Sequence, residues 1–284
     1  MIAPTLAPTK HLTITTVKAG EVLQGADVVS IEEPLEIKLD YGPGNDRATK
    51  NLSVTMRTPG HDDDLAAGFL FTEGIVNNAG DIEDIFYADR YCAEQKQNSI
   101  VVKLVASCLP VLQNADRNFY TTSSCGVCGK GSIEAIRTVS KFGTLNGGDI
   151  KVEKNILYQL PAALMEHQHD FSQTGGIHAS ALFSLSGGLL SLREDVGRHN
   201  ALDKLIGNAL VTGLLPLNNH LLLLSGRASF ELVQKAAMAG IRIIAAIGAP
   251  SSLAVELAAE FNITLVGFLK SNRFNIYTSP ERIV

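Results

Sequence analysis

The chain has 284 residues, of which 45% are hydrophobic and 19% charged, a composition typical of a folded protein and not of a disordered one. Its formal net charge of -5 argues against a nucleic-acid-binding surface, so any basic site must be local. The opening MIAPTLAPTK lacks the features of a signal peptide, and the aliphatic stretch at Leu221 to Leu224 is far shorter than the roughly 20 residues of a membrane span. We therefore expect a cytoplasmic protein that binds neither membrane nor nucleic acid.

The first part of the chain, to about residue 115, is rich in predicted strands. β-branched or alternating residues predict strands over His11 to Lys18, Pro34 to Leu39, Leu52 to Arg57 and Ser99 to Val105. The turn-rich DYGPGNDRATKN suits a hairpin between the second and third of these strands. The segment HDDDLAAGFLFTEG predicts a helix, in which the three aspartates act through capping and the dipole; this interpretation is favoured over a hard-cation site. One helix on a small, mostly antiparallel sheet is the expected arrangement.

The composition changes in FYTTSSCGVCGKG, which has three glycines, two serines and two threonines. Such a segment has almost nothing to anchor it in a core, so we expect a mobile loop. Helices are predicted to follow over Ser132 to Lys141 and Lys154 to His169, with Pro161 as a kink or break in the second helix.

The last hundred residues alternate between strand and helix patterns. Strands are predicted over Ile177 to Leu185 and Leu189 to Val196, joined at Gly187 and Gly188. The alternation that follows predicts an α/β layered sheet with parallel strands. Its expected elements are a helix over Asn200 to Thr212, a strand over Leu221 to Leu224, a helix over Ser229 to Ala239, a strand over Ile241 to Ile247, a helix over Ser251 to Glu260 and a strand over Ile263 to Phe268. The expected organisation is a flexible tail (1–10), a strand-rich α+β N-terminal domain (11–115), a mobile loop (116–131) and an α/β domain (132–284).

The pair Cys125 and Cys128 is the first candidate for chemistry. A Cys-x-x-Cys arrangement can lower the pKa of its first thiol, and Lys130 is close enough in sequence to favour the thiolate. Two sulfurs on a glycine-rich loop suit the acceptance of sulfur at one surface and its delivery at another. The spacing alone leaves three readings open: a reactive pair, half of a metal site, or a structural loop.

A zinc site would need more ligands than this segment provides. Cys92 and Cys108 do not form a second close pair, and we interpret these two cysteines as small core residues. No histidine follows Cys128 closely. A deaminase zinc site would have His-x-Glu upstream of Pro-Cys-x-x-Cys, whereas Ser124 precedes the pair here and no His-x-Glu occurs upstream. We expect no structural zinc and no other metal site.

Three turns that follow predicted strands carry cationic and small polar residues. Exposed N–H groups at a helix start, together with arginine, favour phosphate binding, and neighbouring strand ends form the usual ligand position in open α/β sheets. The alternatives are solvated ion-pair networks and, for His199 and His178, histidines satisfied within the core. The candidate ligand residues are Arg193, Arg198, His199 and Lys204; Ser225, Gly226 and Arg227; and Phe268, Leu269, Lys270, Ser271, Asn272 and Arg273.

Six stretches between about Met56 and Thr278 are distinctive in combination: MRTPGHDDDLAAGFLFTEG, TTSSCGVCGKG, GGIHASALF, LREDVGRHNALDKLIG, SGRASFELVQKAAMAGI and NRFNIYT. Together they resemble the FdhD family of sulfur carrier proteins required for formate dehydrogenase activity. One departure is Asn272, where the resemblance would place glycine.

The resemblance implies a cytidine-deaminase-like three-layer core without the zinc, a smaller strand-rich N-terminal domain, and a homodimer. It implies a sulfurtransferase-type relay in which Cys125 carries a persulfide and Cys128 is its partner. Sulfur would come from a cysteine desulfurase and pass to bis(molybdopterin guanine dinucleotide), with Phe268 to Arg273 against the guanine dinucleotide and GDP-like nucleotides as mimics. The remaining partner would be the formate dehydrogenase apoprotein. The competing hypotheses are a nucleotide- or cofactor-binding chaperone with non-catalytic cysteines, and a zinc deaminase.

Overall fold

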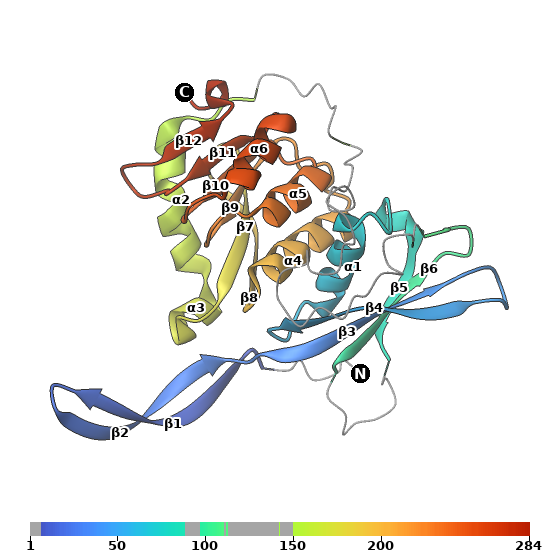
Figure 1. The fold of residues 1–284 in the computed structure, drawn as a ribbon, viewed down its shortest axis with the longest axis horizontal. Helices are drawn as coiled ribbons and strands as arrows, with labels where there is room; N and C mark the ends of the chain where they lie inside the picture. The colour runs from blue at the N-terminus through green and yellow to red at the C-terminus, as the bar shows by residue number, and fades with distance from the viewer. Residues whose placement is uncertain (1–6, 89–96, 111, 113–141, 143–149) are drawn as a thin grey trace.

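The structure is a computed structural model that describes residues 7–88, 97–110, 112, 142 and 150–284. The predicted mobile loop, the predicted helix at 132–141, and Cys92, Cys125 and Cys128 lie outside these residues. Three sheets are present among them: an N-terminal hairpin, a four-stranded sheet and a six-stranded sheet (Figure 1).

The four-stranded sheet has the order β4-β3-β6-β5, with β3 and β6 parallel and the other two pairs antiparallel. The predicted hairpin and the helix after it are both confirmed, and α1 (Asp62–Thr72) packs against this sheet. The strand β5 was not predicted, because its sequence IEDIFY does not alternate regularly. The strands are β3 (Glu33–Tyr41), β4 (Ala48–Arg57), β5 (Ile82–Tyr87) and β6 (Ser99–Leu104); a short 3-10 helix, η1 (Ala79–Asp81), precedes β5.

The six-stranded sheet is mixed: the parallel pairing predicted for the alternating strands is confirmed for three of them but does not extend to the whole sheet. Only β9, β10 and β11 pair in parallel, while β7 is antiparallel to both its neighbours and β12 is antiparallel to β11. The short turn at Gly187 (φ 88°) forces β7 and β8 to be antiparallel, since parallel neighbours need a long crossover. As a result β8, β9, β10 and β11 all run in one direction. The sheet order is β12-β11-β10-β9-β7-β8, with β7 (His178–Ser184), β8 (Leu189–Asp195), β9 (His220–Leu224), β10 (Ile243–Ala246), β11 (Thr264–Gly267) and β12 (Asn275–Thr278).

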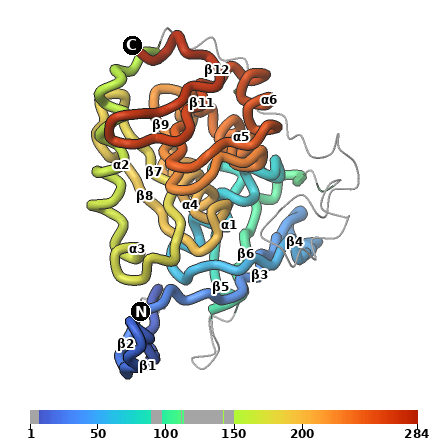
Figure 2. Tube along the Cα trace, turned by 60° about the vertical axis from the view of Figure 1, so that its left-hand side comes forward, coloured from blue at the N-terminus to red at the C-terminus, as the bar shows by residue number. Residues whose placement is uncertain are grey.

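Helices cover both faces of the six-stranded sheet (Figures 1 and 2). On one face lie α4 (Arg198–Val211), α5 (Phe230–Met238) and α6 (Ser252–Glu260), and on the other lies α2 (Lys154–His167). The predicted break in the second helix falls at Gln168, where ψ is 83°, and not at Pro161, which lies inside α2. A shorter helix, α3 (His169–Thr174), follows, and the last turn of the chain is η3 (Pro280–Arg282).

The two predicted domains share one hydrophobic core. A single cluster of buried residues contains Leu35 and Leu52 of the four-stranded sheet, Leu70 of α1, Leu202 of α4 and Leu222 of the six-stranded sheet. Figure 2 shows α1 beside α4, between the two sheets. The parts before and after residue 115 therefore pack as one body through these helices.

The N-terminal hairpin projects from this body (Figure 1). It consists of β1 (Thr9–Lys18) and β2 (Glu21–Ser30), so residues 9 and 10, which were assigned to the predicted tail, belong to a strand. Most of its side chains are exposed, and it meets the body at α3, where Ser30 Oγ donates to Thr174 Oγ1 at 2.9 Å. Within the part of the chain that the structure describes, no helix has both the length and the apolar character needed to cross a membrane.

Candidate functional site

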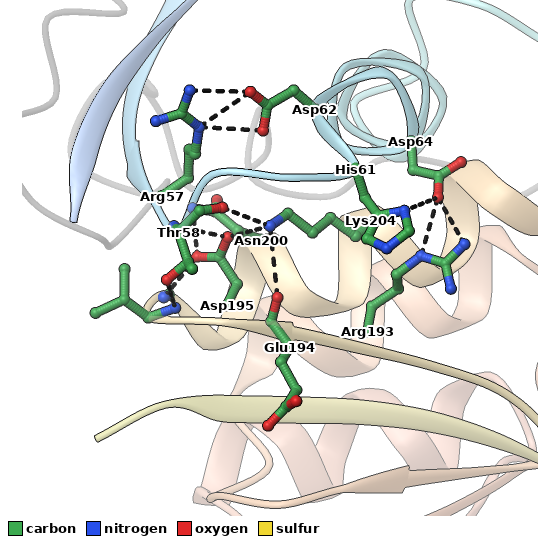
Figure 3. Close-up of polar contacts among 12 residues, drawn as sticks. Arg57, Thr58, His61, Asp62, Asp64, Arg193, Glu194, Asp195, Asn200 and Lys204 are labelled. Atoms are coloured by element: carbon green, nitrogen blue, oxygen red, sulfur yellow. Dashed lines mark hydrogen bonds and ion pairs between the residues drawn. The ribbon is translucent and has the colours of Figure 1, made fainter. Parts of the chain in front are cut away.

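The segment after β4 and the segment after β8 meet in a buried polar cluster, here called the α1–α4 joint (Figure 3). Lys204 Nζ lies 2.7 Å from Asp195 Oδ2 and donates to the carbonyl oxygen of Thr58 at 2.8 Å. The Lys204 and Asp195 side chains are 1% and 0% exposed. Asn200 Nδ2 donates to Asp195 Oδ1 at 3.2 Å and to the Met56 carbonyl oxygen at 2.8 Å. These contacts tie the end of β4 to the start of α4.

Two aspartates of the 62–64 run extend this joint. Arg57 Nη2 donates to Asp62 Oδ2 at 2.9 Å inside the protein, and the Tyr87 hydroxyl donates to the same oxygen at 3.0 Å. Burial first, and then the Asp62 charge, raise the pKa of the Tyr87 phenol above its ordinary value. Asp64 Oδ2 accepts from Arg193 Nη2 at 2.7 Å. The run starts α1 as predicted, but its predicted capping role is wrong, because His61 is the N-cap and its side chain makes no capping hydrogen bond. Asp62 and Asp64 instead bind arginine side chains.

The backbones of α1 and α4 touch within the joint. A Cβ atom at Gly68 would lie well inside van der Waals contact with the Asp203 carbonyl oxygen, and one at Gly207 would do the same with the Asp64 carbonyl oxygen. Only glycine at these two positions allows the helices to approach so closely.

The joint uses two of the predicted phosphate ligands. Arg193 is held by Asp64, and Lys204 is fully buried against Asp195. Contact of either side chain with a phosphate would require its ion pair to open, so the predicted role of these two residues does not fit the described conformation.

The other candidate residues gather at one end of the six-stranded sheet, here called the strand-end edge. The turns that follow β9, β10 and β11 are joined by backbone hydrogen bonds: Gly248 N donates to the Gly226 carbonyl oxygen at 2.9 Å, and Phe268 N donates to the Gly248 carbonyl oxygen at 3.0 Å. The helices α4, α5 and α6 begin just beyond β8, β9 and β10, so their N-termini lie at this end too. The turns at 225–227 and 268–273, which the sequence placed in equivalent positions past their strands, thus lie at the same end of the sheet, with the turn at Gly248 between them.

The turn after β11 presents an aromatic ring and two cations. Phe268 has φ 53°, an unusual value for a bulky residue, and its side chain is 38% exposed. Lys270 N donates to the Arg273 carbonyl oxygen at 2.8 Å, which closes the turn, and both residues are exposed, as are Ser271 and Asn272. Leu269 is the exception within this turn, because its side chain is buried in the cluster on the α2 side of the sheet.

The turn after β9 is close to the first residue of β7. Ser225 Oγ accepts from Ala179 N at 2.8 Å, and a Cβ atom at Gly226 would meet the His178 ring at 3.4 Å. Burial first, and then Arg198 and His199, lower the pKa of His178. Arg227 is exposed beyond this turn.

The start of α4 supplies Arg198 and His199. His199 Nε2 lies 2.8 Å from Glu231 Oε2, in the first turn of α5, while His199 Nδ1 and Arg198 Nε are buried and have no hydrogen-bond partner among the described residues. Sequence reasoning missed Glu231, because an acidic residue in the first turn of a helix is ordinarily explained by the dipole. It also missed the anchoring role of Arg57 and Tyr87, which no local pattern indicates.

One of the four cysteines, Cys108, lies in the described part of the chain. Cys108 is partly buried against the core, as predicted, and burial first, and then the charge of Asp81, raise the pKa of its thiol. Among residues 7–88, 97–110, 112, 142 and 150–284, no group of three or more His, Cys, Asp and Glu side chains could hold a metal ion. That finding does not reach Cys125 and Cys128, so their lack of a metal stays a prediction.

Comparison with known proteins identifies the family. A model of the FdhD/NarQ family matches residues 30–284. The chain belongs to this family. Within it, the chain is 48% identical over 278 residues to the sulfur carrier protein FdhD of Mycolicibacterium paratuberculosis, covering 97% of this chain and 98% of that protein. It is 46% identical over 277 residues to the FdhD protein of Streptomyces avermitilis, covering 97% and 95%.

A solved structure agrees with the FdhD/NarQ assignment. A protein from Desulfotalea psychrophila, assigned as a formate dehydrogenase accessory protein, superposes with a TM-score of 0.73 at 26% identity, covering 98% of this chain and all of that one. The FdhD/NarQ model starts at residue 30, where β2 ends, so the projecting hairpin precedes the matched region.

Proposed function

We propose that this protein is a sulfur carrier for the maturation of formate dehydrogenase. The observation that carries the proposal is membership in the FdhD/NarQ family, whose curated relatives are named sulfur carrier proteins and match almost the whole chain. The sequence Cys125-Gly-Val-Cys128 supplies two thiols at a spacing suited to sulfur exchange. The proposal includes a cytidine-deaminase-like core, for which the layered mixed sheet is the support, and a homodimer.

The proposed sulfur chemistry has two steps. The Cys125 thiolate attacks the outer sulfur of a persulfide on a cysteine desulfurase, an S–S bond forms to Cys125, and the desulfurase cysteine leaves as a thiolate. The Cys128 thiolate then attacks the inner sulfur of the Cys125 persulfide. A Cys125–Cys128 disulfide forms, and the outer sulfur leaves as hydrosulfide for the acceptor. The disulfide must afterwards be reduced by a cellular thiol.

The proposed acceptor is bis(molybdopterin guanine dinucleotide), bound as substrate before it enters the formate dehydrogenase apoprotein. The strand-end edge fits an anionic nucleotide, because three helix N-termini lie beside exposed cations. Arg198, Arg227, Lys270 and Arg273 are the side chains best placed for its phosphates, and the exposed ring of Phe268 suits stacking on a base.

Sulfur loading on Cys125 is the test. The purified protein is incubated with a cysteine desulfurase and cysteine, and intact mass is measured before and after reduction. We expect one reductant-labile sulfur on the wild type and on Cys108→Ala, and none on Cys125→Ala. The Cys128→Ala protein should load sulfur but fail to release it to an acceptor.

A Cys125→Ala protein that still gains the sulfur and still activates formate dehydrogenase would exclude this function. Activation retained with alanine at both Cys125 and Cys128, but lost on substitution of Arg227 and Arg273, would instead indicate a nucleotide-binding chaperone.

A further inference from the structure

A carboxylate–histidine pair links the starts of α4 and α5 at the strand-end edge. His199 Nε2 lies 2.8 Å from Glu231 Oε2 and 3.4 Å from Ser229 Oγ. The His199 residue is 8% exposed, and its Nδ1 atom has no hydrogen-bond partner within the part of the chain that the structure describes. The sulfur-transfer chemistry proposed above does not use this pair.

The contact with Glu231 determines where the imidazole proton lies. An ionised carboxylate only accepts hydrogen bonds, and a neutral imidazole carries one N–H, so the proton must be on Nε2. Burial acts to raise the pKa of Glu231, but the hydrogen bond from His199 and the nearby cationic side chains of Lys235 and Arg198 outweigh it and lower the pKa below its ordinary value. The charged and titratable groups near the ring are thus Glu231 and Lys235 of α5, Arg198 of α4 and His178 at the start of β7.

The helix starts support the same assignment of charge. Glu231 is in the first turn of α5, where the dipole favours an anion, and His199 is in the first turn of α4, where the dipole disfavours a cation. A neutral imidazole with its proton on Nε2 presents a lone pair on Nδ1. A buried acceptor without a partner is unfavourable, and in the neighbouring α1–α4 joint the buried Asp195, Asn200 and Lys204 side chains all have partners.

We propose that Glu231 is a positioning residue that holds His199 in the Nε2–H tautomer, so that Nδ1 accepts a hydrogen bond from the base or ribose of a nucleotide bound at the strand-end edge. Ionised phosphate oxygens only accept, so they cannot pair with Nδ1, whereas a guanine base offers N–H donors and ribose offers O–H donors. This inference rests on the proposed function only for the identity of the ligand.

Nitrogen-15 NMR of the histidine rings at about pH 8, where histidine is ordinarily neutral, tests the tautomer without any sulfur donor. We expect His199 of the wild type to be protonated on Nε2 alone. In Glu231→Gln, whose amide can either accept or donate, we expect a mixture of both tautomers. A wild-type His199 that carries its proton on Nδ1, or whose tautomer is the same in both proteins, would overturn the inference.

The ligand contact is tested with GDP and, as a matched anion without base or sugar, inorganic pyrophosphate. Saturating GDP should move the Nδ1 resonance of His199 in the direction of hydrogen-bond acceptance, and pyrophosphate should not. Equal movement with both ligands, or none with GDP, would refute the proposal.

Calorimetric titration with GDP separates positioning from direct contact. His199→Phe and Glu231→Gln should each weaken binding about tenfold, and the double variant should bind no more weakly than His199→Phe. Losses that multiply to about a hundredfold would show that Glu231 acts independently of His199 and would overturn the positioning role. His220→Phe is the control, because His220 also has an Nδ1 atom without a partner but lies at the opposite end of β9, and its GDP affinity should be unchanged.

Folding is checked for each variant by urea unfolding, so that a misfolded protein is not read as a loss of binding. The outcome is separable from that of the sulfur-carrier proposal. The tautomer is decided in protein that has met no sulfur donor, whereas sulfur loading on Cys125 is decided by mass in a separate assay. If sulfur loading on Cys125 fails while the tautomer result holds, the sulfur-carrier proposal is wrong and the positioning role of Glu231 stands. If loading succeeds and the tautomer result fails, only the positioning role is wrong.

Discussion

The α1–α4 joint and the strand-end edge both use residues of the stretch LREDVGRHNALDK, but they differ in whether the buried polar atoms of that stretch have hydrogen-bond partners. In the joint, Asp195, Asn200 and Lys204 are buried and hydrogen-bonded to one another or to backbone. At the edge, buried atoms of Arg198 and His199 have no partner among the described residues. In the joint the paired side chains hold α4 against the end of β4, whereas at the edge the unpaired atoms of Arg198 and His199 lie in the region proposed to bind a nucleotide.

The largest difference between the two regions is expected in the free energy of unfolding when a cation is removed. Lys204→Met should destabilise the protein by about 3–5 kcal/mol, because it leaves the Asp195 carboxylate buried without its counter-ion. Arg227→Met removes an exposed cation at the edge and should change the free energy of unfolding by no more than about 0.5 kcal/mol. Urea unfolding of both variants measures the difference, and equal effects would contradict the division between joint and edge.

The helix contact inside the joint should be the next most sensitive feature. Gly207→Ala should cost about 1–3 kcal/mol, since the new methyl group meets the Asp64 carbonyl oxygen and pushes α1 from α4. The opposing gain in helix propensity is at most about 1 kcal/mol. Asn208→Ala, at the adjacent and less buried position, gains propensity without the clash and should be neutral or slightly stabilising by the same urea measurement.

Acidification should destabilise the edge through His178. The pKa of His178 is lowered in the folded protein, chiefly by burial, so below about pH 6.5 the unfolded chain binds a proton that the folded protein refuses. Stability from this group is therefore complete above about pH 6.5 and falls as the pH drops toward the folded-state pKa. His178→Gln should flatten the loss of unfolding free energy between about pH 6.5 and 5, an effect smaller than that of Lys204→Met. An unchanged slope would show that the ring is not desolvated.

The smallest effect on stability is expected for Arg198→Gln, which should change the free energy of unfolding by no more than about 0.5 kcal/mol. Its effect on ligand binding should be larger: GDP affinity should fall about tenfold, because a charge-assisted hydrogen bond to phosphate is lost. A variant that unfolds as easily as Lys204→Met, with GDP affinity intact, would place Arg198 in the joint.

Much of the division between joint and edge depends on which face of a helix is buried, and the sequence alone does not show this. The positions of most strands and helices were predictable from periodicity, and so was the convergence of the turns at 225–227 and 268–273, because parallel strands end at one edge. What periodicity could not show is which face of α4 meets α1. Asn200 and Lys204 are four residues apart and so share a face, while His199 is rotated toward α5.

Other predicted residues have surroundings that the sequence did not show. Arg193 and Lys204 were predicted to bind phosphate because cations near a helix start often do, but in the described conformation they pair with Asp64 and Asp195. Leu269 was included with its neighbours although an apolar residue between polar ones more often anchors a turn to the core. The strand β2 was missed because its apolar residues are exposed and its alternation buries no face.

The backbone contact between Gly68 and Gly207 has a dynamic consequence. Two helices that touch carbonyl to Cα cannot slide or rock against each other without opening a gap along the shared core. The four-stranded and six-stranded sheets should therefore open together, and amide hydrogens of α1 and α4 should exchange with solvent at a common, slow rate. Any rearrangement that admits the proposed nucleotide is then confined to surface turns, while the pair of helices at the centre of the molecule stays rigid.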